Sequence, residues 1–535
     1  MDVESVHIEA DNETPPDRRS SLVWDGAFFV LLACTALIVL AVPVFPSQDG
    51  PVHLYYVDVL RGLLRHSGPY PQHFAIKTFL TPYALEYYAI LALEMVFSPV
   101  MSEKLLVCGY ILAFGLGFRY LVESVAGRRN PWTLAGIPFC MNNLVYMGFL
   151  NYSFGVALML FMSGYWIRFS GRLSRGRVIA LMAGLVLMLL THPVPVAVFL
   201  LLIGLYFAAD FIQDAAAGSW SWVPCLRARL RPLVLLAVMV GTAAVWVNLF
   251  VDRSLQTALP DSYVAAYGWV RTAMTELNLK MVAPFLAYRY RVGLVLLLGL
   301  AVLTLTMNSW KRGGRVSSAL LALIAASAIC FALYGIVPPD INGSGFFAER
   351  FPVFWAVLLI ASAAALRPPR QWNATAGVIA LCLAGGVLLQ QWGYVSPIAT
   401  AIHPVLAAAP MNAGSEGLII GPPASRPAGL SFNPFLWSGA HYFRRSEAIL
   451  ANAPWVDLPI IMIGLVHADR WNCLDPHPAT MQLSGAMIDR EPVSELDFVV
   501  EEERPTVEMN ALVDSMGYSN ATGDNQFFRV FRRAH

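Results

Sequence analysis

The chain has 535 residues, of which 57% are hydrophobic and only 13% are charged. A soluble domain usually carries about 25% charged residues, so this composition excludes an ordinary soluble protein and indicates a multi-pass membrane protein. Lys and Arg number 36 against 35 Asp and Glu. The resulting net charge of +1 gives no general basic field for binding nucleic acid. The seven cysteines form no CxxC motif and no Cys/His cluster, so structural zinc and a disulfide framework are not expected.

Hydrophobic runs long enough to span a membrane occur throughout the first 395 residues. The first, at about residues 27–45, follows an acidic tail and Arg18-Arg19, and we interpret it as a retained signal anchor. Ten further runs bring the prediction to about eleven transmembrane helices. They lie near 104–125, 132–147, 152–168, 178–191, 194–213, 233–251, 292–308, 317–336, 352–366 and 375–395.

The run at residues 83–97 is ambiguous, because it is short and contains Glu86 and Glu94, which is typical of a helix at the membrane interface. If it does not span and the N-terminus is cytoplasmic, the short basic loops all lie inside, in agreement with the positive-inside rule. The loops at 46–102 and 252–290 then lie outside. The alternative has twelve spans and an external N-terminus, and it places the first loop in the cytoplasm.

The last 140 residues are more polar than the rest of the chain. Alternating patterns predict strands at Leu496–Glu501 and Gln526–Arg533, with a helix between them at Thr506–Met516. We therefore predict an α-helical polytopic membrane protein with a small extracytoplasmic α/β domain at its C-terminus. Its predicted parts are a cytoplasmic tail at 1–21, a transmembrane domain at 22–395 and the α/β domain at 396–535.

The first outer loop opens with a segment that suits the start of a helix. Pro51 favours the first helical turn and Gly50 favours the bend before it, so Asp49 would lie next to the helix N-terminus and His53 one turn further along. A carboxylate here could accept a proton from an acceptor hydroxyl, or hold a divalent metal together with His53. The simpler alternative is that Asp49 only stabilises the helix end.

These features together resemble the GT-C superfamily of polyprenyl-phosphate-sugar-dependent glycosyltransferases, which includes protein O-mannosyltransferases and aminoarabinose transferases. The shared features are a long first span, an acidic residue directly outside it, a long first outer loop, about eleven spans and an outer C-terminal domain. The closing stretch from Leu496 to Arg533 also resembles the tail of many bacterial members. The family's acidic motif falls at Asp49, but Gln48 precedes it, so a doubled acidic motif is lacking.

The resemblance implies a GT-C-like fold, a bacterial inner-membrane location and a catalytic site at Asp49 and His53. Asp49 would act as the general base in transfer of a sugar from a polyprenyl-phosphate donor to a glycan, lipid or protein acceptor. No cofactor is required with certainty, and the one candidate is a divalent metal at Asp49 and His53.

Such a transfer requires positive charge at the leaving phosphate. Arg350, beside Glu349 at the start of a predicted span, is one candidate, and a snorkelling anchor would explain the same pair. His192, in the turn between two spans, is another, and a local cap is the simpler interpretation. Two further phosphate-binding candidates, for which contact with the membrane surface is the simpler explanation, are Arg253 and Arg289.

Other polar groups allow two interpretations. Asn151 and Tyr152 could line a cavity for lipid or sugar, although interhelical hydrogen bonding is sufficient to explain them. The basic group of His441, Arg444 and Arg445 could contact an acceptor glycan, and an ordinary surface is the simpler interpretation.

Two other classes of function compete with a glycosyltransferase. A transporter or flippase of lipid-linked glycans would need ionisable groups near the bilayer midplane, and the middle spans contain few charges. A non-catalytic membrane scaffold would not depend on Asp49 or Arg350. The sequence contains no GxxxxGK[ST], HExxH or GxSxG motif, which leaves ATP-driven transport, zincin proteolysis and serine hydrolysis without support.

Overall fold

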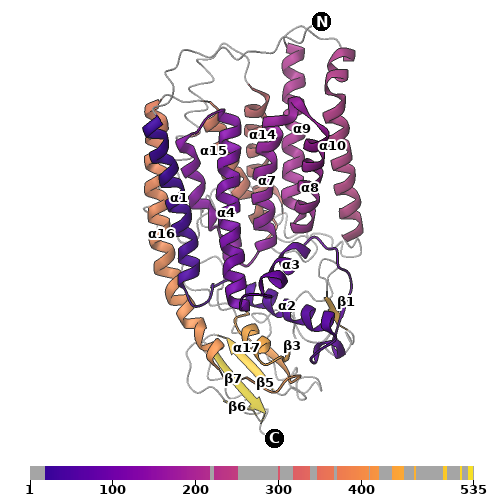
Figure 1. The fold of residues 1–535 in the computed structure, drawn as a ribbon, viewed down its shortest axis with the longest axis vertical. Coiled ribbons are helices and arrows are strands. Elements are labelled where there is room, and N and C mark those ends of the chain that lie inside the picture. The colour runs from indigo at the N-terminus through magenta and orange to yellow at the C-terminus, as the bar shows by residue number, and fades with distance from the viewer. Residues whose placement is uncertain are drawn as a thin grey trace.

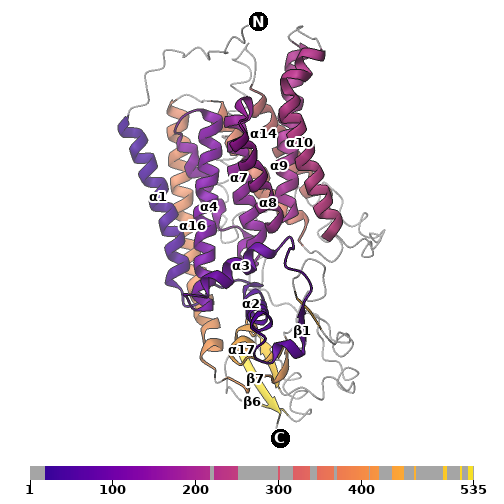
Figure 2. The same ribbon diagram turned by 45° about the vertical axis from the view of Figure 1, so that its right-hand side comes forward.

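The computed structural model describes residues 18–216, 222–250, 299, 301, 317–337, 346–366, 370–408, 410–420, 437–450, 463–465, 498–502, 518–520 and 528–533. Most of these residues form a bundle of long helices, with a smaller part at one end that contains a sheet (Figures 1 and 2). The predicted class, an α-helical multi-pass membrane protein with a C-terminal α/β part, is therefore confirmed.

Eight of the described helices are long and apolar enough to cross a membrane. They are α1 (Arg18–Ala41), α4 (Pro99–Ala126), α7 (Leu150–Phe169), α9 (Pro193–Ala216), α10 (Trp222–Phe250), α14 (Ser318–Ile336), α15 (Phe351–Ala365) and α16 (Arg370–Ala407). Helix α15 reaches this length together with the 3-10 turn before it, as Ala348–Ala365. A ninth predicted run forms α8 (Arg175–Thr191), a helix of 17 residues. The run at 292–308 lies outside the described residues apart from positions 299 and 301. Helix α16 ends at Ala407, past residue 395, where the sequence places the domain boundary.

The prediction of a spanning helix at 132–147 is wrong. This run forms three short pieces, the 3-10 helix η2 (Pro131–Gly136), α5 (Ile137–Cys140) and α6 (Asn143–Tyr146). The break has a local cause, because the Asn142 side chain accepts a hydrogen bond from Leu144 N at 3.0 Å and so starts a new helix at α6. The pieces are nevertheless buried in the bundle, which explains their apolar composition.

The segment between α1 and α4, which the sequence predicts as the first outer loop and for which we keep that name, forms a layer at one end of the bundle (Figure 1). It contains α2 (Gly50–Arg65), the 3-10 helix η1 (Tyr70–Gln72), the strand β1 (Phe74–Ile76) and α3 (Ala84–Leu93). Helix α3 has ten residues and is about 15 Å long, about half the thickness of a bilayer core, so it cannot span. The remaining 3-10 helices of the described chain are η3 (Ser170–Arg172) and η5 (Ala348–Arg350).

The C-terminal part contains the helix α17 (Ala440–Arg445) and a five-stranded mixed sheet in the order β3-β2-β5-β7-β6. Strand β2 pairs in parallel with β3 and β5, and β7 pairs antiparallel with β5 and β6. The predicted strands at 496–501 and 526–533 are found as β5 and β7, and the predicted helix at 506–516 lies outside the described residues. The strand bounds are Glu416–Ile420 (β2), Ile449–Leu450 (β3), Ile463–Leu465 (β4), Phe498–Glu502 (β5), Tyr518–Asn520 (β6) and Phe528–Arg533 (β7).

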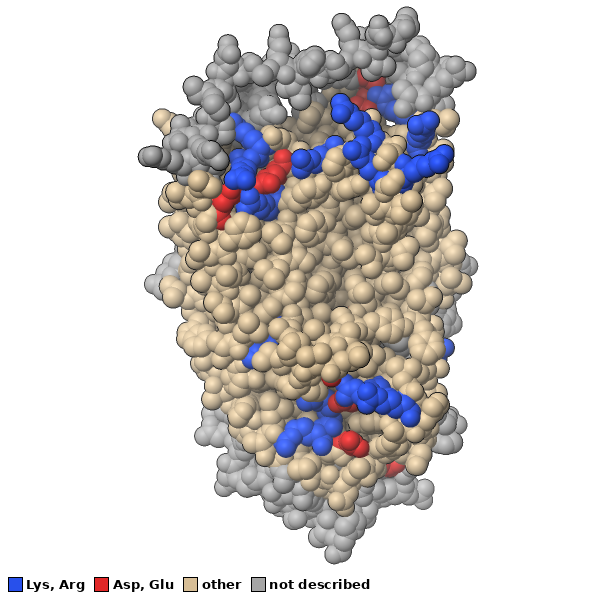
Figure 3. Space-filling view, in the orientation of Figure 1, with Lys and Arg blue, Asp and Glu red and all other residues tan. Residues whose placement is uncertain are grey.

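On the face of the molecule that Figure 3 shows, the charges of the described residues gather near the two ends. Figure 3 shows Lys and Arg in one belt toward the N-terminal end and in a second group near the opposite end, with a nearly uncharged band between them. The sheet and the first outer loop lie at the end opposite the start of α1 (Figure 1). This distribution is what a membrane-embedded bundle requires.

Candidate functional site

Asp49 lies in the turn that connects α1 to α2. The backbone of this turn is fixed by the chain just before α7, because Gln48 N donates to Tyr146 O at 2.8 Å and Asp49 N donates to Met147 O at 3.1 Å. Pro51 is in the first turn of α2, as the sequence predicts. Asp49 is therefore positioned by two segments that are about 100 residues apart in sequence.

Gly148 allows the two segments to approach this closely. Its φ is +88°, a conformation that L side chains rarely adopt. A Cβ at this position would lie 2.8 Å from Gly50 N and 3.1 Å from the Asp49 Cβ. A side chain larger than that of glycine would therefore push the start of α2 away.

The Asp49 side chain is buried, with 3% of its surface exposed. It stands at the N-cap position of α2 but makes no capping hydrogen bond. Instead its Oδ1 accepts a hydrogen bond from Gln48 Nε2 at 3.3 Å. Burial raises the pKa of Asp49 from 3.8 to about 7, and the hydrogen bond from Gln48 opposes this shift. A carboxyl group with a pKa near neutrality is suited to general base catalysis.

His53 lies one turn further along α2, and His53 N donates to Asp49 O at 3.1 Å. Its Nδ1 is 3.1 Å from the hydroxyl of Tyr87 on α3. Burial lowers the pKa of His53 to about 4, so the ring is neutral at pH 7. Within the described part of the chain, no three His, Cys, Asp or Glu side chains are placed to hold a metal ion. Asp49 and His53 therefore offer two donors at most, and a metal site there stays a prediction.

Two further carboxyl groups are buried in this region, and neither is among the site residues predicted from the sequence. Glu86, on α3, is 3% exposed, and its Oε2 accepts a hydrogen bond from Asn151 Nδ2 at 2.5 Å. Burial raises the pKa of Glu86 to about 8. The hydrogen bond with Asn151 lowers this pKa, and the negative charges of Glu103 and Asp49 raise it further. Glu86 is therefore mostly protonated at pH 7.

Glu103, on α4, is the second of these groups and is 1% exposed. Its Oε1 accepts a hydrogen bond from Ser47 Oγ at 2.7 Å. A Cβ on Gly50 would lie 2.1 Å from the same oxygen, so the carboxyl group lies directly against the backbone next to Asp49. An ionisable residue at the start of a predicted span was the signal that could have identified it.

Arg350 lies in η5 and is 5% exposed. Its guanidinium carbon is 5.6 Å from the ring centroid of Phe149 and 5.4 Å from that of Phe347, which are cation–π distances. Its carbonyl oxygen accepts a hydrogen bond from the Tyr152 hydroxyl. Glu349, the preceding residue, is half-buried. Arg350 is thus a cation held inside the bundle and not a snorkelling anchor at its surface.

His192 is buried in the turn between α8 and α9. Its ring lies edge-to-face with Tyr83 and Tyr152, with centroids 5.4 Å apart in both pairs. Nδ1 accepts a hydrogen bond from Val194 N at 3.1 Å, which is the local cap that the sequence suggested. Nε2 is buried and has no hydrogen-bond partner among the described residues. Burial and the nearby charge of Arg350 lower the pKa of His192 well below its usual value, so the ring is neutral.

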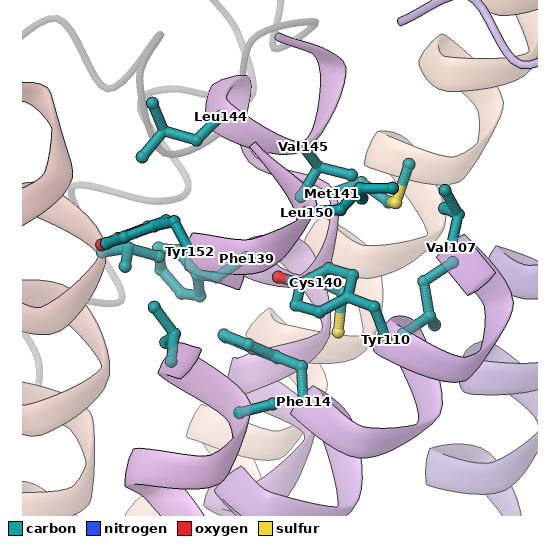
Figure 4. Close-up of a cluster of buried hydrophobic side chains, with 14 of the residues drawn as sticks. Val107, Tyr110, Phe114, Phe139, Cys140, Met141, Leu144, Val145, Leu150 and Tyr152 are labelled. Carbon is teal, nitrogen blue, oxygen red and sulfur yellow. The ribbon is translucent and has the colours of Figure 1, made fainter. Parts of the chain in front are cut away.

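Three of the predicted residues, Asp49, Arg350 and His192, contact residues 148–152 at the start of α7, which we call the 148–152 segment. Along it, Gly148 contacts Asp49, Phe149 contacts Arg350, Asn151 bonds to Glu86, and Tyr152 contacts His192. The segment is supported by buried apolar side chains that include Tyr110, Phe139 and Cys140 (Figure 4). His53 is connected to this segment only indirectly, because its Nδ1 lies 3.1 Å from the hydroxyl of Tyr87, the residue that follows Glu86. Arg253 and Arg289 lie outside the described residues.

Of the three basic residues His441, Arg444 and Arg445 in the C-terminal part, two are buried and do not lie on the surface. His441 and Arg444 are buried where α17 packs against α2, so the interpretation of these two residues as ordinary surface or as a glycan contact is wrong. Arg445 is exposed, as expected of a surface residue, and its Nη1 donates to Ala408 O at 3.0 Å. The sequence alone could not show which of the three residues are buried and which is exposed, because all three lie within one short helix.

Comparisons with known proteins add a similarity of structure. No family model matches the sequence, and no curated protein sequence matches it. Among solved structures, the chain is similar to ArnT from Cupriavidus metallidurans in the apo state, with 13% sequence identity and a TM-score of 0.47. The match covers 95% of this chain and 98% of that chain. A similarity at this level says nothing about activity.

Proposed function

We propose that the chain is an integral-membrane glycosyltransferase of the inner membrane. It moves a sugar from a polyprenyl-phosphate donor to a glycan, lipid or protein acceptor on the outer side, and Asp49 is the general base. One observation carries this proposal. A buried carboxyl group with a pKa of about 7 and a buried arginine both contact the 148–152 segment.

The reaction needs one base and one cation. The acceptor hydroxyl gives its proton to the Asp49 carboxylate, and its oxygen forms a bond to the anomeric carbon of the sugar. The bond between that carbon and the phosphate oxygen breaks, and the polyprenyl phosphate leaves with the electron pair. Arg350 offers positive charge to the departing phosphate. Attack from the face opposite the leaving group inverts the anomeric centre.

The protonation of the neighbouring groups favours an anionic donor. Glu86, with a pKa of about 8, is mostly neutral at pH 7, and His53 and His192 are neutral as well. Two carboxyl groups in one region resist simultaneous ionisation. The total negative charge of Asp49 and Glu86 at pH 7 is therefore smaller than that of two carboxylates in water. The phosphate therefore meets less repulsion at this site.

The substitution Asp49→Asn tests the role of Asp49. We expect transfer to fall by roughly 10²–10⁴-fold, the usual contribution of a general base. The measurement is release of polyprenyl phosphate when purified protein is incubated with polyprenyl-phosphate sugars and acceptor. The melting temperature near neutral pH should not fall, because asparagine has nearly the same shape.

The matched control is Asp25→Asn. Asp25 pairs with Arg119 and Arg129 on α4 and the loop after it, toward the end of the bundle where α1 begins, so its loss should leave transfer nearly unchanged. Full activity of the Asp49→Asn variant would remove Asp49 from catalysis. Equal losses in both variants would indicate a general effect on the fold.

A further inference from the structure

The C-terminal part of the chain is attached to the first outer loop at several points. Strand β4 pairs antiparallel with β1, with Phe74 opposite Leu465. The Tyr55 hydroxyl on α2 donates to Ala448 O at 3.2 Å and accepts from Leu450 N at 3.0 Å. Helix α17 packs directly on α2. Because α2 begins next to Asp49, these contacts connect the C-terminal part to the candidate base.

The contact between α17 and α2 contains a buried arginine. Arg444 is 9% exposed, and its Nε lies 3.6 Å from Asp58 Oδ2. Asp58 is shared, because its Oδ1 accepts a hydrogen bond from Arg61 Nη1 at 2.9 Å. Nη1 of Arg444 is buried and makes no hydrogen bond within the described part of the chain. One shared carboxylate does not satisfy this guanidinium, so a further hydrogen-bond acceptor or negative charge is needed nearby.

Glu103 is the carboxyl group that fits this requirement. The Arg444 guanidinium is attracted to both Asp58 and Glu103, and these attractions oppose the lowering of the Arg444 pKa by burial. Oε2 of Glu103 is buried and has no hydrogen-bond partner among the described side chains and backbone, while Oε1 accepts from Ser47. Both side chains are therefore buried and incompletely hydrogen-bonded, and the charge of Arg444 favours the ionised form of Glu103 over the neutral form that burial favours.

We propose that Arg444, which contacts Asp58 of α2, and Glu103 of α4 act as a pair of attracting buried charges, without direct contact, through which the C-terminal part positions Asp49; this inference rests on the function proposed above. Arg444 balances the charge of Glu103. Glu103 in turn holds Ser47 and the backbone of Gly50 against α4, on either side of Asp49. Both are positioning residues that do not touch the substrate. The C-terminal part is then required for the chemical step and not only for recognition of an acceptor.

The test compares four variants of the full chain in detergent or nanodiscs: Arg444→Gln, Glu103→Gln, the double variant, and Arg445→Gln as the control on the same helix. We expect Arg444→Gln to lower kcat by roughly ten- to hundredfold with little change in KM for the donor, because misplacement of a base by about 1 Å has effects of this size. The double variant should recover a large part of this loss, since it leaves no unpaired carboxylate. Arg445→Gln should stay within about twofold of the unchanged chain, the range expected for a surface substitution.

A second measurement does not depend on activity. Hydrogen–deuterium exchange of peptides covering residues 46–54 should increase in Arg444→Gln and return toward the original level in the double variant. Arg444→Lys, which keeps the charge, should show an intermediate increase. If Arg444→Gln does not yield a folded protein, Arg444→Lys and the double variant carry the test, and a double variant that also fails to fold overturns the pairing.

The outcomes separate the two proposals. Unchanged kcat and unchanged exchange in Arg444→Gln overturn the charge pair while leaving Asp49 as the base. Losses that multiply in the double variant, without recovery, show that the two residues act independently and also overturn it. If the unchanged chain transfers no sugar from any polyprenyl-phosphate donor, the proposed function fails, and the exchange of residues 46–54 still decides whether Arg444 and Glu103 hold the turn.

Discussion

Burial changes the chemistry of Asp49. In water this carboxyl group would be ionised above pH 4 and would be a weak base, whereas in the folded chain its pKa is about 7. The same effect acts on Glu86, on the neighbouring element, and the two negative charges oppose one another. A residue type that is common in loops therefore becomes a proton acceptor matched to neutral pH because of what surrounds it.

The pH dependence of transfer follows from this shift. The base must be ionised, so activity should rise about tenfold per pH unit below pH 7 and level off above it. The measurement is initial rate of transfer between pH 5 and 9 at saturating donor. A rate that is independent of pH across this range would contradict Asp49 as the titrating base.

The contribution of Asp49 to the stability of the folded chain should fall as the pH rises, whereas the rate of transfer should rise. The folded pKa lies above the unfolded value of about 4, so the contribution of Asp49 to stability is complete below pH 4 and is lost as the pH rises through about 7. Asp49→Asn removes this dependence. Its melting temperature at pH 8 should equal or exceed that of the unchanged chain, with a smaller difference at pH 5.

At the scale of the elements, the site depends on the contact between the start of α2 and the loop that precedes α7. Gly148 makes this contact possible through its φ of +88° and its lack of a side chain. Gly148→Ala would place a Cβ 2.8 Å from Gly50 N and would cost about 1–2 kcal/mol in backbone strain. We expect kcat to fall by roughly a hundredfold, because Asp49 moves with α2.

The control for Gly148→Ala is Gly176→Ala. Gly176 lies in the first turn of α8, and a Cβ there would meet no atom within 4 Å. This variant should keep full activity and an unchanged or slightly higher melting temperature. The measurements are kcat for transfer and thermal unfolding of both variants. A Gly148→Ala variant with normal kcat would mean that the contact does not position the base.

The elements also show where sequence patterns succeed and fail. Apolar runs of spanning length correctly predicted α4, α7 and α14, because a helix inside a membrane must be apolar along its whole length. The run at 132–147 has the same composition but is broken at Asn142, whose side chain starts a new helix. Composition cannot distinguish a continuous helix in lipid from short helices buried inside a protein.

At the scale of the whole molecule, α2 and the sheet lie at the end opposite the start of α1 (Figure 2), and Asp49 is the residue directly before α2. Four arginines, at positions 168, 172, 175 and 177, lie at or beside the connection between α7 and α8. The positive-inside rule then predicts that this connection is cytoplasmic and that Asp49 faces outside.

Cysteine labelling tests this orientation. Ser67→Cys, in the exposed chain after α2, should react with a membrane-impermeant maleimide in intact cells. Gly171→Cys, in the exposed connection between α7 and α8, should react only after the cells are permeabilised. The unchanged chain, labelled in parallel, accounts for its own cysteines. The reverse pattern would place Asp49 in the cytoplasm and overturn transfer on the outer face.

The sequence by itself determined the features that depend on local composition and order. Hydrophobic length specified a helical membrane protein, the Asp49-Gly50-Pro51 pattern specified a helix start next to a carboxylate, and alternation specified strands near the C-terminus. Each of these follows from a few neighbouring residues, because backbone hydrogen bonding and the side-chain period are local properties.

Only the tertiary structure decided which ionisable groups are buried together. It placed Arg350, His192 and Asp49 in contact with the same short segment, residues 148–152, and it added Glu86, which the sequence had suggested only as a sign of an interfacial helix. It also placed Arg444 inside, next to an exposed Arg445 on the same helix. The pKa and the partners of a charge depend on side chains brought from distant parts of the chain, so no local pattern contains them.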